Sequence, residues 1–309
     1  MDFQSCVFRK WARPTLANLT AVAVLSVAMM TTVYAQKNFS SPEAAMDAFG
    51  DAVLKDREDA LRAIFGDDFR ELIPPIGAQV RDTFVAQWAK SHAIEPTDTR
   101  HARIAVGDDG WTFPIPLVKT DQGWHFDTHA GAEVMRARRI GRNELAVIQT
   151  MLVIYDAQRE YAQTNHDGEG VLAYAARMVS SPGKHDGLYW PTGPDDNPSP
   201  LGEAFVDATS RNVQNAGYYG YHFKLLESQG PHAPGGAYDY VVRGKLFGGF
   251  AVIAWPVKYG DTGIKSFMVS HAGQVYERDL GPGSAAKAEA TKSFDPGPGW
   301  SKVPDTDSQ

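Results

Sequence analysis

The sequence predicts an α+β protein in which helices and a small antiparallel meander come first and a long helix packed on an antiparallel sheet follows. Three observations lead to this prediction: helical spacing of apolar residues within 42–91, a long helical pattern over 132–163, and short runs of strand-forming residues between 221 and 279. The chain accordingly divides into a leader, an N-terminal unit, a second unit and a tail, at residues 1–35, 36–130, 131–280 and 281–309.

The leader has the features of a cleaved export signal. Basic residues up to Arg13 give it a positive start, residues 16–30 are uncharged and largely apolar, and small residues precede Gln36. The apolar run is shorter than the ~20 residues of a membrane-spanning helix, which favours cleavage over the alternative of an uncleaved anchor. We expect cleavage between Ala35 and Gln36, export to the periplasm or the extracellular space, and no membrane attachment afterwards.

The composition excludes several classes of protein. The one cysteine, Cys6, lies in the leader, so the exported chain has no disulfide, thiolate metal site or cysteine nucleophile. The net charge of the whole chain is −7, and the leader contributes +2, which leaves −9 on residues 36–309. This charge argues against nucleic acid and anionic membranes as partners. The sequence indicates no cofactor.

The N-terminal unit is predicted to begin with a helix capped by Ser41, and shorter helices follow at 61–65 and 83–91. Glycine turns then separate three strands of an antiparallel meander, at residues 102–106, 111–118 and 124–127. This order of elements over residues 39–128 resembles the cystatin-like cones of the nuclear-transport-factor type. In such a cone, strand aromatics either line a ligand site or, more commonly, fill the core. The residues concerned are Trp111, Trp124 and Phe126.

The second unit is predicted to begin with a spine helix over 132–163, which either breaks near Gly141, with Asn143 as a new N-cap, or continues. Two apolar stripes lie side by side on this helix. We expect burial of the stripe formed by Leu145, Ile148, Leu152 and Tyr155; the other is formed by Val147, Met151 and Ile154. An arginine cluster near the start is either a solvated face or an anion site, and comprises Arg136, Arg138, Arg139 and Arg142.

After an irregular connection over 164–200, the strand pattern predicts one antiparallel sheet. The predicted strands lie at 221–226, 237–242, 250–255, 264–269 and 274–279. A long helix leading into such a meander resembles the heads of type IV pilins and pseudopilins, and residues 260–269 are similar to the last hairpin of some pilin-like heads. The tail is rich in glycine, proline and serine, so we expect it to be largely disordered.

The exported chain as a whole resembles a secreted bacterial family catalogued as domain of unknown function 2950. The resemblance extends over about residues 39–294 and implies no reaction, ligand or partner. The blocks that carry it are residues 111–118, 124–128, 138–145 and 233–240.

Few residues suggest chemistry. His125, Asp127 and His129 are the candidate cluster for a metal or for acid/base catalysis. The oxygen-rich loops at 166–169 and 195–197 are candidates for calcium, and ordinary turn hydrogen bonding is the alternative reading of both. The favoured hypothesis is a non-catalytic envelope or extracellular module that binds a protein or glycan partner. The alternative is a hydrolase-like enzyme whose site lies where the two units meet, near the arginine cluster and the two histidines.

Overall fold

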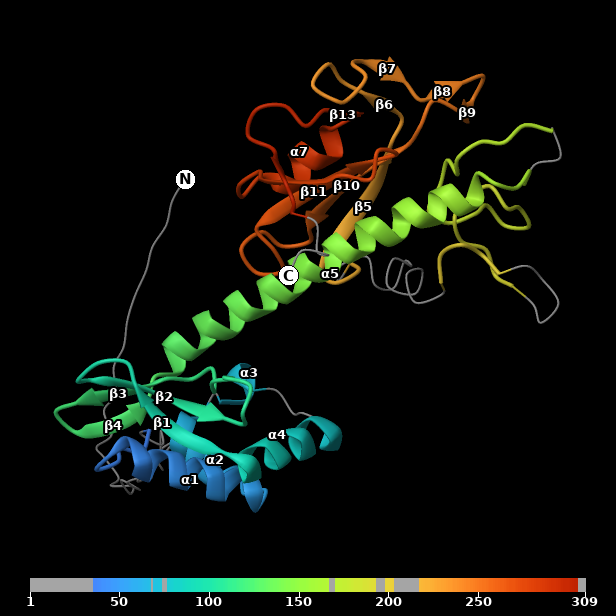
Figure 1. Ribbon diagram of the computed structural model, residues 1–309. Coiled ribbons are helices and arrows are strands. Elements are labelled where there is room, and N and C mark those ends of the chain that lie inside the picture. The colour runs from blue at the N-terminus through green and yellow to red at the C-terminus, as the bar shows by residue number, and fades with distance from the viewer. Residues whose placement is uncertain are drawn as a thin grey trace, which may run out of the picture.

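The structure is a computed structural model, and it describes residues 36–67, 69–73, 77–166, 170–192, 198–202 and 217–304. The leader, residues 1–35, lies outside the described residues, which begin at Gln36 directly after the expected cleavage point. Figure 1 shows two groups of helices and strands connected by one long helix, α5 (Thr128–Tyr161). The predicted α+β class is confirmed, because helices and antiparallel sheets are combined in both groups.

In the N-terminal unit, four helices pack against a four-stranded sheet. The helices are α1 (Pro42–Leu54), α2 (Glu58–Phe65), α3 (Phe69–Leu72) and α4 (Ala78–Lys90). The strands are β1 (His92–Pro96), β2 (His101–Val106), β3 (Leu117–Thr120) and β4 (Gly123–Phe126), antiparallel in that order. Ser41 caps α1 as predicted, since its Oγ accepts a hydrogen bond from the backbone N–H of Ala44.

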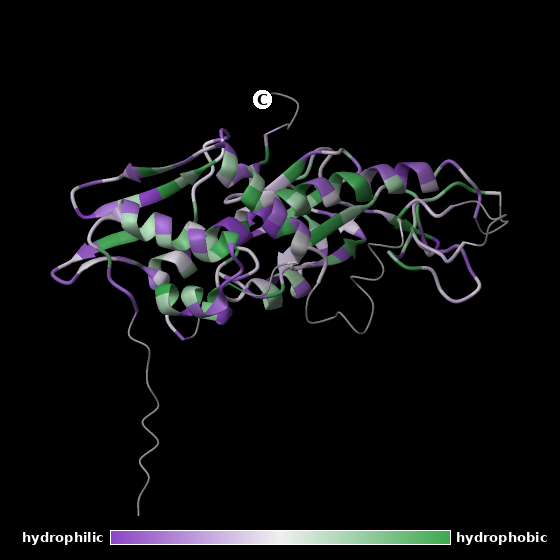
Figure 2. Cartoon of the chain, turned by 90° about the horizontal axis from the view of Figure 1, so that it is seen from below, coloured by the Kyte–Doolittle hydropathy of each residue, from purple (hydrophilic) through white to green (hydrophobic). Residues whose placement is uncertain are grey.

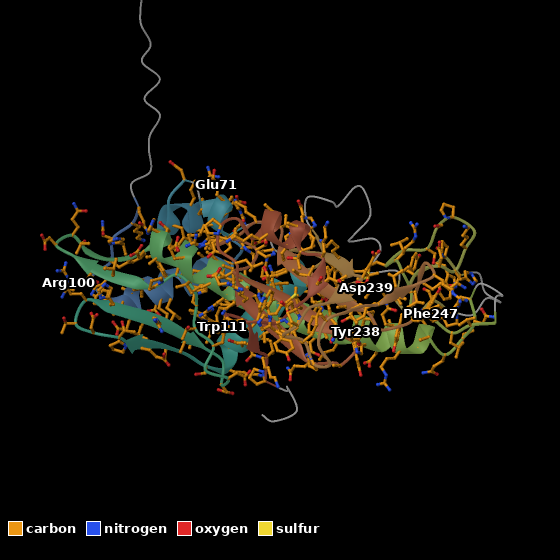
Figure 3. All side chains as sticks on the ribbon, turned by 90° about the horizontal axis from the view of Figure 1, so that it is seen from above. Glu71, Arg100, Trp111, Tyr238, Asp239 and Phe247 are labelled. Carbon is orange, nitrogen blue, oxygen red and sulfur yellow. The ribbon has the colours of Figure 1, made fainter. Side chains whose placement is uncertain are left out.

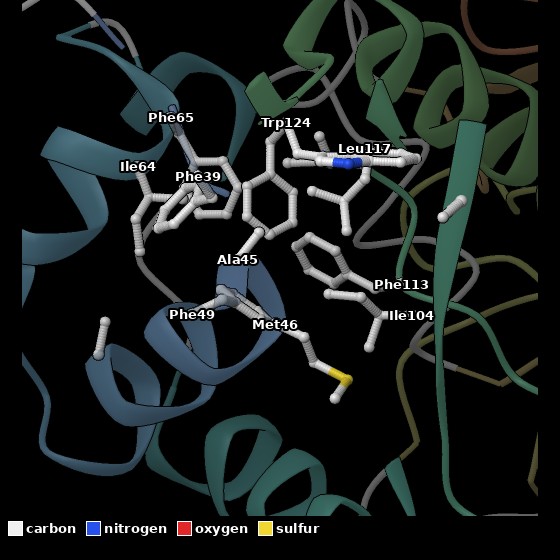
Figure 4. Close-up of a cluster of buried hydrophobic side chains, with 14 of the residues drawn as sticks. Phe39, Ala45, Met46, Phe49, Ile64, Phe65, Ile104, Phe113, Leu117 and Trp124 are labelled. Carbon is white, nitrogen blue, oxygen red and sulfur yellow. The ribbon is translucent and has the colours of Figure 1, made fainter. Parts of the chain in front are cut away.

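The core of this unit is a group of phenylalanine rings at the centre of Figure 4. The ring centroids of Phe49 and Phe113 lie 4.4 Å apart, and those of Phe65 and Phe126 lie 5.0 Å apart. Such ring pairs stabilise a core beyond the apolar area that they bury. Of the three aromatic residues singled out in the sequence, Trp124 and Phe126 are core residues, whereas Trp111 is 43% exposed.

The predicted three-stranded meander is wrong in its strand count, because β1 precedes it and pairs with β2 along its whole length. The side chains of β1 are all exposed or half-buried, so its sequence lacks the alternation that signals a strand. Residues 111–116 form only one bridge, between Thr112 and Ala105, before β3 begins at Leu117. Pro114 and Pro116 lack the N–H groups that a longer ladder would need.

Helix α5 is continuous through Gly141 and Asn143, and Asp127 caps its start by accepting a hydrogen bond from the N–H of Ala130. The expected burial is wrong for Leu145, which is 62% exposed, and Ile148 and Leu152 are only half-buried at the edge of the core. The fully buried residues are those of the other stripe, Val147, Met151 and Ile154, which pack on the second sheet. Two adjacent apolar stripes satisfy the same helical period, so the period alone does not decide which of them faces the sheet.

The second sheet has the strand order β14-β12-β11-β10-β5. Its strands are β5 (Tyr221–Leu226), β10 (Ala251–Pro256), β11 (Lys265–Ser270), β12 (Val275–Asp279) and β14 (Ser301–Lys302). Helix α5 packs on one face, and α7 (Ser284–Ala290) lies on the other. Every residue of β10 is therefore buried, and Figure 2 shows hydrophobic colouring on these central strands.

The predicted strand at 237–242 does not belong to this sheet. Its residues are divided between β7 (Tyr238–Asp239) and β8 (Val241–Val242), which pair with β6 (Ser228–Gln229) and β9 (Lys245–Leu246). Tyr240 separates them: its ring is fully buried and its Oη donates to Oε1 of Gln229. Burying this ring directs the chain away from the large sheet.

The expectation of a largely disordered tail is wrong for residues 281–304. Phe294, in β13 (Ser293–Phe294), and Val303, next to β14, are buried. Lys224 of β5 holds the end of α7, because its Nζ donates to the carbonyls of Glu289 and Thr291 at 2.6 Å each. These partners are distant in the sequence, so the composition of the tail does not reveal them. Residues 305–309 lie outside the described part.

Polar contacts dock the middle of α5 onto the loop that leads into β11. Oε1 of Glu144 accepts hydrogen bonds from the N–H groups of Ile264 and Lys265, at 2.8 and 2.9 Å. Nδ2 of Asn143 donates to the carbonyl of Thr262, and Arg139 pairs with Asp261. The contacts join two sequence blocks that were noted separately, 138–145 and 260–269. Within the described residues, no helix is long and apolar enough to cross a membrane.

Two half-buried histidines predict how stability depends on pH. Burial lowers the pKa of His222 and of His271 below the usual value of about 6.5. Between the lowered values and about 6.5, the unfolded chain binds more protons than the folded chain, so stability is lost as the pH falls through that window. Urea melts at about pH 7.5 and about pH 5 should show this loss. A double variant, His222→Gln with His271→Gln, should lose less stability between these two pH values. An equal loss would mean that these two histidines are not its cause.

Candidate functional site

The structure gives His125, Asp127 and His129 separate surroundings. Asp127 is the N-cap of α5, His129 is exposed in the first turn of that helix, and His125 pairs with Val118 across β4 and β3. Nδ1 of His125 is buried and has no hydrogen-bond partner. No hydrogen bond or ion pair joins the three residues, and the described part of the chain contains no group of three or more His, Cys, Asp or Glu suited to a metal ion.

A cavity of about 690 Å³ lies at the C-terminal end of α5. Its walls come from that helix end, from the connection over 171–186 and from the β8–β9 hairpin. The lining combines aromatic, histidine and charged side chains, among them Tyr161, His166, Tyr174, Arg177, Lys184, His185, Asp186 and Lys245. We call this cavity the helix-end pocket.

Two buried side chains of α5 position the connection that forms the pocket wall. The side-chain amide of Gln158 makes hydrogen bonds of 2.9 Å with both the N–H and the carbonyl of Ala175. Tyr161 is 8% exposed, and its Oη donates to the carbonyl of His185 at 2.6 Å. A satisfied buried amide holds a loop in one conformation, because an alternative position would leave polar groups unpaired.

Stacked rings make up much of the pocket wall. The rings of Tyr161 and His166 lie 4.0 Å apart between centroids and are nearly parallel, at 19°. His185 stacks in the same way on the buried ring of Trp190, at 4.4 Å. On the opposite side, the N–H of Tyr174 donates to the carbonyl of Leu246 and ties the connection to β9. These contacts build the wall before any ligand is present.

The charge of the pocket is opposite to the charge of the protein. Among the residues that the structure describes, Arg177, Lys184 and Lys245 line it together with one carboxylate, Asp186. Asp186 is engaged internally, because it accepts hydrogen bonds from the N–H of Ser181 at 2.7 Å and from the hydroxyl of Ser181 at 2.9 Å. These bonds, the first above all, lower the pKa of Asp186 and keep it ionised. It also forms a long ion pair with Arg177, at 3.8 Å from Nε, so three cations and one carboxylate leave the lining positive. A net positive lining among the described residues, on a chain whose net charge is −7, favours an anionic ligand.

Few features of the sequence point to this site. His166 does line the pocket, but residues 167–169 and 195–197 of the two proposed calcium loops lie outside the described residues. The pocket uses no motif, and its basic residues come from the irregular connection and a hairpin far along the chain. One usable signal is that residues 170–185 contain Arg177, Lys184 and His185 but no Asp or Glu, in a chain whose net charge is −7.

These observations define an α+β protein with two cores, a connecting helix and a cationic pocket at the end of that helix. The chain belongs to the family described as "Protein of unknown function (DUF2950)", whose model matches residues 36–303. No curated protein matches the chain, and no solved structure does. The similarity of the two units to cystatin-like cones and pilin heads therefore stays a prediction.

Proposed function

We propose that the protein is an exported, non-catalytic binding module that takes an acidic glycan into the helix-end pocket. The observation that carries this proposal is the positive, ring-lined pocket on an acidic protein. Its volume of about 690 Å³ lies within the usual range of small-ligand sites. Guanidinium and ammonium groups bind a carboxylate through charge-assisted hydrogen bonds. The tyrosine and histidine rings provide an apolar surface and polar atoms that sugar units can contact.

The shape of the site favours a glycan over a folded protein partner. A stable protein–protein interface needs about 800 Å² from each side, in a broad complementary surface. The helix-end pocket is instead a concave site that accepts one end or one short stretch of a chain. An acidic peptide shares the charge but not the sugar rings, so it serves as a competing ligand in the test below.

Titration calorimetry with trigalacturonate tests the proposal. Arg177→Ala and Lys184→Ala should each weaken binding about tenfold, the loss expected for one charge-assisted hydrogen bond. Lys302→Ala is the matched control, because Lys302 is exposed on β14 and its loss changes the net charge equally. Neutral maltotriose should not bind measurably. Equal affinity for pentaglutamate, or equal effects of all three substitutions, would contradict a glycan site in the pocket.

The hydrolase alternative has no supporting observation in the described residues, since no contact brings His125 and His129 together with Asp127. The non-catalytic proposal predicts that trigalacturonate is recovered intact after long incubation with the protein at neutral pH. Chromatography of the reaction mixture measures this. Release of shorter saccharides by the purified protein would replace the binding-module proposal with the enzyme alternative.

Export is part of the proposal and carries its own prediction. The small residues at Val33 and Ala35 place a signal-peptidase site before Gln36. Intact-mass spectrometry of protein recovered from the envelope or medium should give a chain that begins at Gln36. A mature form that keeps Met1 would show that the protein stays anchored by its leader.

A further inference from the structure

A second positively charged site lies where the N-terminal unit meets α5. Arg138 and Arg142 are four residues apart on α5, and this spacing places them on one face of the helix. Arg103 projects from β2 on the exposed face of that strand. Burial lowers the pKa of Arg138, and the positive charges of Arg103 and Arg142 lower it further, so the three guanidinium groups act on one another.

These three arginines differ from their neighbours on the same helix. Arg136 pairs with Glu133, and Arg139 pairs with Asp261, so both belong to the solvated face that the sequence allowed. In the part of the chain that the structure describes, no carboxylate forms an ion pair with Arg103, Arg138 or Arg142. Glu95 is the cross-strand neighbour of Arg103 and does not close a pair with it.

The guanidinium of Arg138 is held in a fixed place. Nη1 donates to the carbonyl of Thr112 at 2.8 Å, and Nη2 donates to Oγ1 of the same residue at 3.0 Å. A guanidinium has five N–H groups, so these bonds leave others to donate. The contacts hold the guanidinium of Arg138 over the ring of Trp111, with its Cζ 5.7 Å from the ring centroid.

Trp111 supplies an exposed aromatic surface at this place. It is 43% exposed, and the edge of its ring packs on Phe84 at 6.2 Å between centroids. Figure 3 labels it near the middle of the molecule as seen from above. An exposed tryptophan beside unpaired arginines combines a planar apolar surface with donors for an oxyanion.

We propose that Trp111, Arg103, Arg138 and Arg142 form a second ligand site, which binds a saccharide carrying a carboxylate. The sugar ring lies on Trp111, and its carboxylate accepts hydrogen bonds from the guanidinium groups. In the free protein, only water and salt screen the repulsion among the three arginines. A bound carboxylate offsets this repulsion. This site is separate from the helix-end pocket and does not depend on it.

The test uses a protein in which the pocket is disabled by Arg177→Ala and Lys184→Ala. Trigalacturonate should still bind this variant with a stoichiometry near one and change its tryptophan fluorescence. Trp111→Phe, which keeps an aromatic ring, should abolish the fluorescence change. Arg103→Ala and Arg142→Ala should each weaken binding about tenfold, whereas the matched control Arg136→Ala should leave it unchanged within about twofold.

Four results would overturn the second site. Absence of binding to the pocket-disabled variant, with normal binding to the unmodified protein, would leave the helix-end pocket as the sole site. Displacement of trigalacturonate by an equal concentration of inorganic phosphate would show that charge alone is recognised. A fluorescence change that survives Trp111→Phe would place the ligand elsewhere. Absence of binding to the unmodified protein would contradict the pocket proposal as well, which keeps the two failures distinguishable.

Discussion

Replacing Met151 by alanine should lower the free energy of unfolding by about 2–5 kcal/mol, the usual cost of truncating a large buried side chain. Met151 is fully buried between α5 and the second sheet, in contact with the core that includes Val252 and Phe267. The cavity left by the substitution lies at the centre of this interface, where neighbouring strands are also buried and have little room to relax. Urea-induced unfolding monitored by circular dichroism measures the change.

The matched control for this prediction is Leu145→Ala on the same helix. Leu145 is 62% exposed, so its truncation should change stability by no more than about 0.5 kcal/mol. The pair of variants therefore reports which face of α5 meets the sheet. A larger loss from Leu145→Ala than from Met151→Ala would mean that the helix docks through the other stripe, contrary to the structure.

Replacing Gly263 by alanine should be about as damaging, with a loss of about 3 kcal/mol from overpacking and a broken buried hydrogen bond. A methyl group at this position would overlap the phenol ring of Tyr221, which is fully buried. The ring cannot move away freely, because its Oη donates to the carbonyl of Lys265 at 2.9 Å. Burial raises the pKa of Tyr221, so the hydroxyl keeps the proton that it donates.

Gly141→Ala is the control for Gly263→Ala, because it is expected to increase stability rather than to lower it. It lies within α5, and a methyl group there would meet no atom within 4 Å. Since alanine is the better helix former by about 1 kcal/mol, Gly141→Ala should raise the melting temperature. A melting temperature that rises for Gly263→Ala, or falls by several degrees for Gly141→Ala, would contradict the packing described around these two positions.

Local signals in the sequence predicted much of the fold. Ser41 followed by Pro42 marks a helix start, and the cap forms as expected. Glycine turns separate the strands that the pattern identified, including β10, β11 and β12. Features decided by distant contacts were missed. The tail is ordered through partners such as Lys224, and the choice between the stripes of α5 depends on a sheet that follows nearly a hundred residues later.

The candidate sites depended even more on distant contacts. The arginine cluster was visible in the sequence, but the partners of its members were not. Arg136 pairs with Glu133 and Arg139 pairs with Asp261. Arg138 instead donates a hydrogen bond to the carbonyl of Thr112 and has no carboxylate partner among the described residues. The helix-end pocket combines the end of α5 with a hairpin near Lys245. No spacing rule connects these segments, because they lie far apart in the sequence and most of the lining stands on irregular backbone.

Hydrogen exchange in the presence of trigalacturonate tests the central claim, that the helix-end pocket takes an acidic glycan, most directly. If the pocket binds this glycan, backbone amides in residues 173–177 and 184–186 and around Leu246, which line the pocket, should exchange more slowly. Maltotriose should give no such protection. Lys302→Ala should leave the protection unchanged, whereas Arg177→Ala should remove it. Unchanged exchange in these segments at saturating trigalacturonate would contradict glycan binding in the helix-end pocket, whatever protection is seen near Trp111.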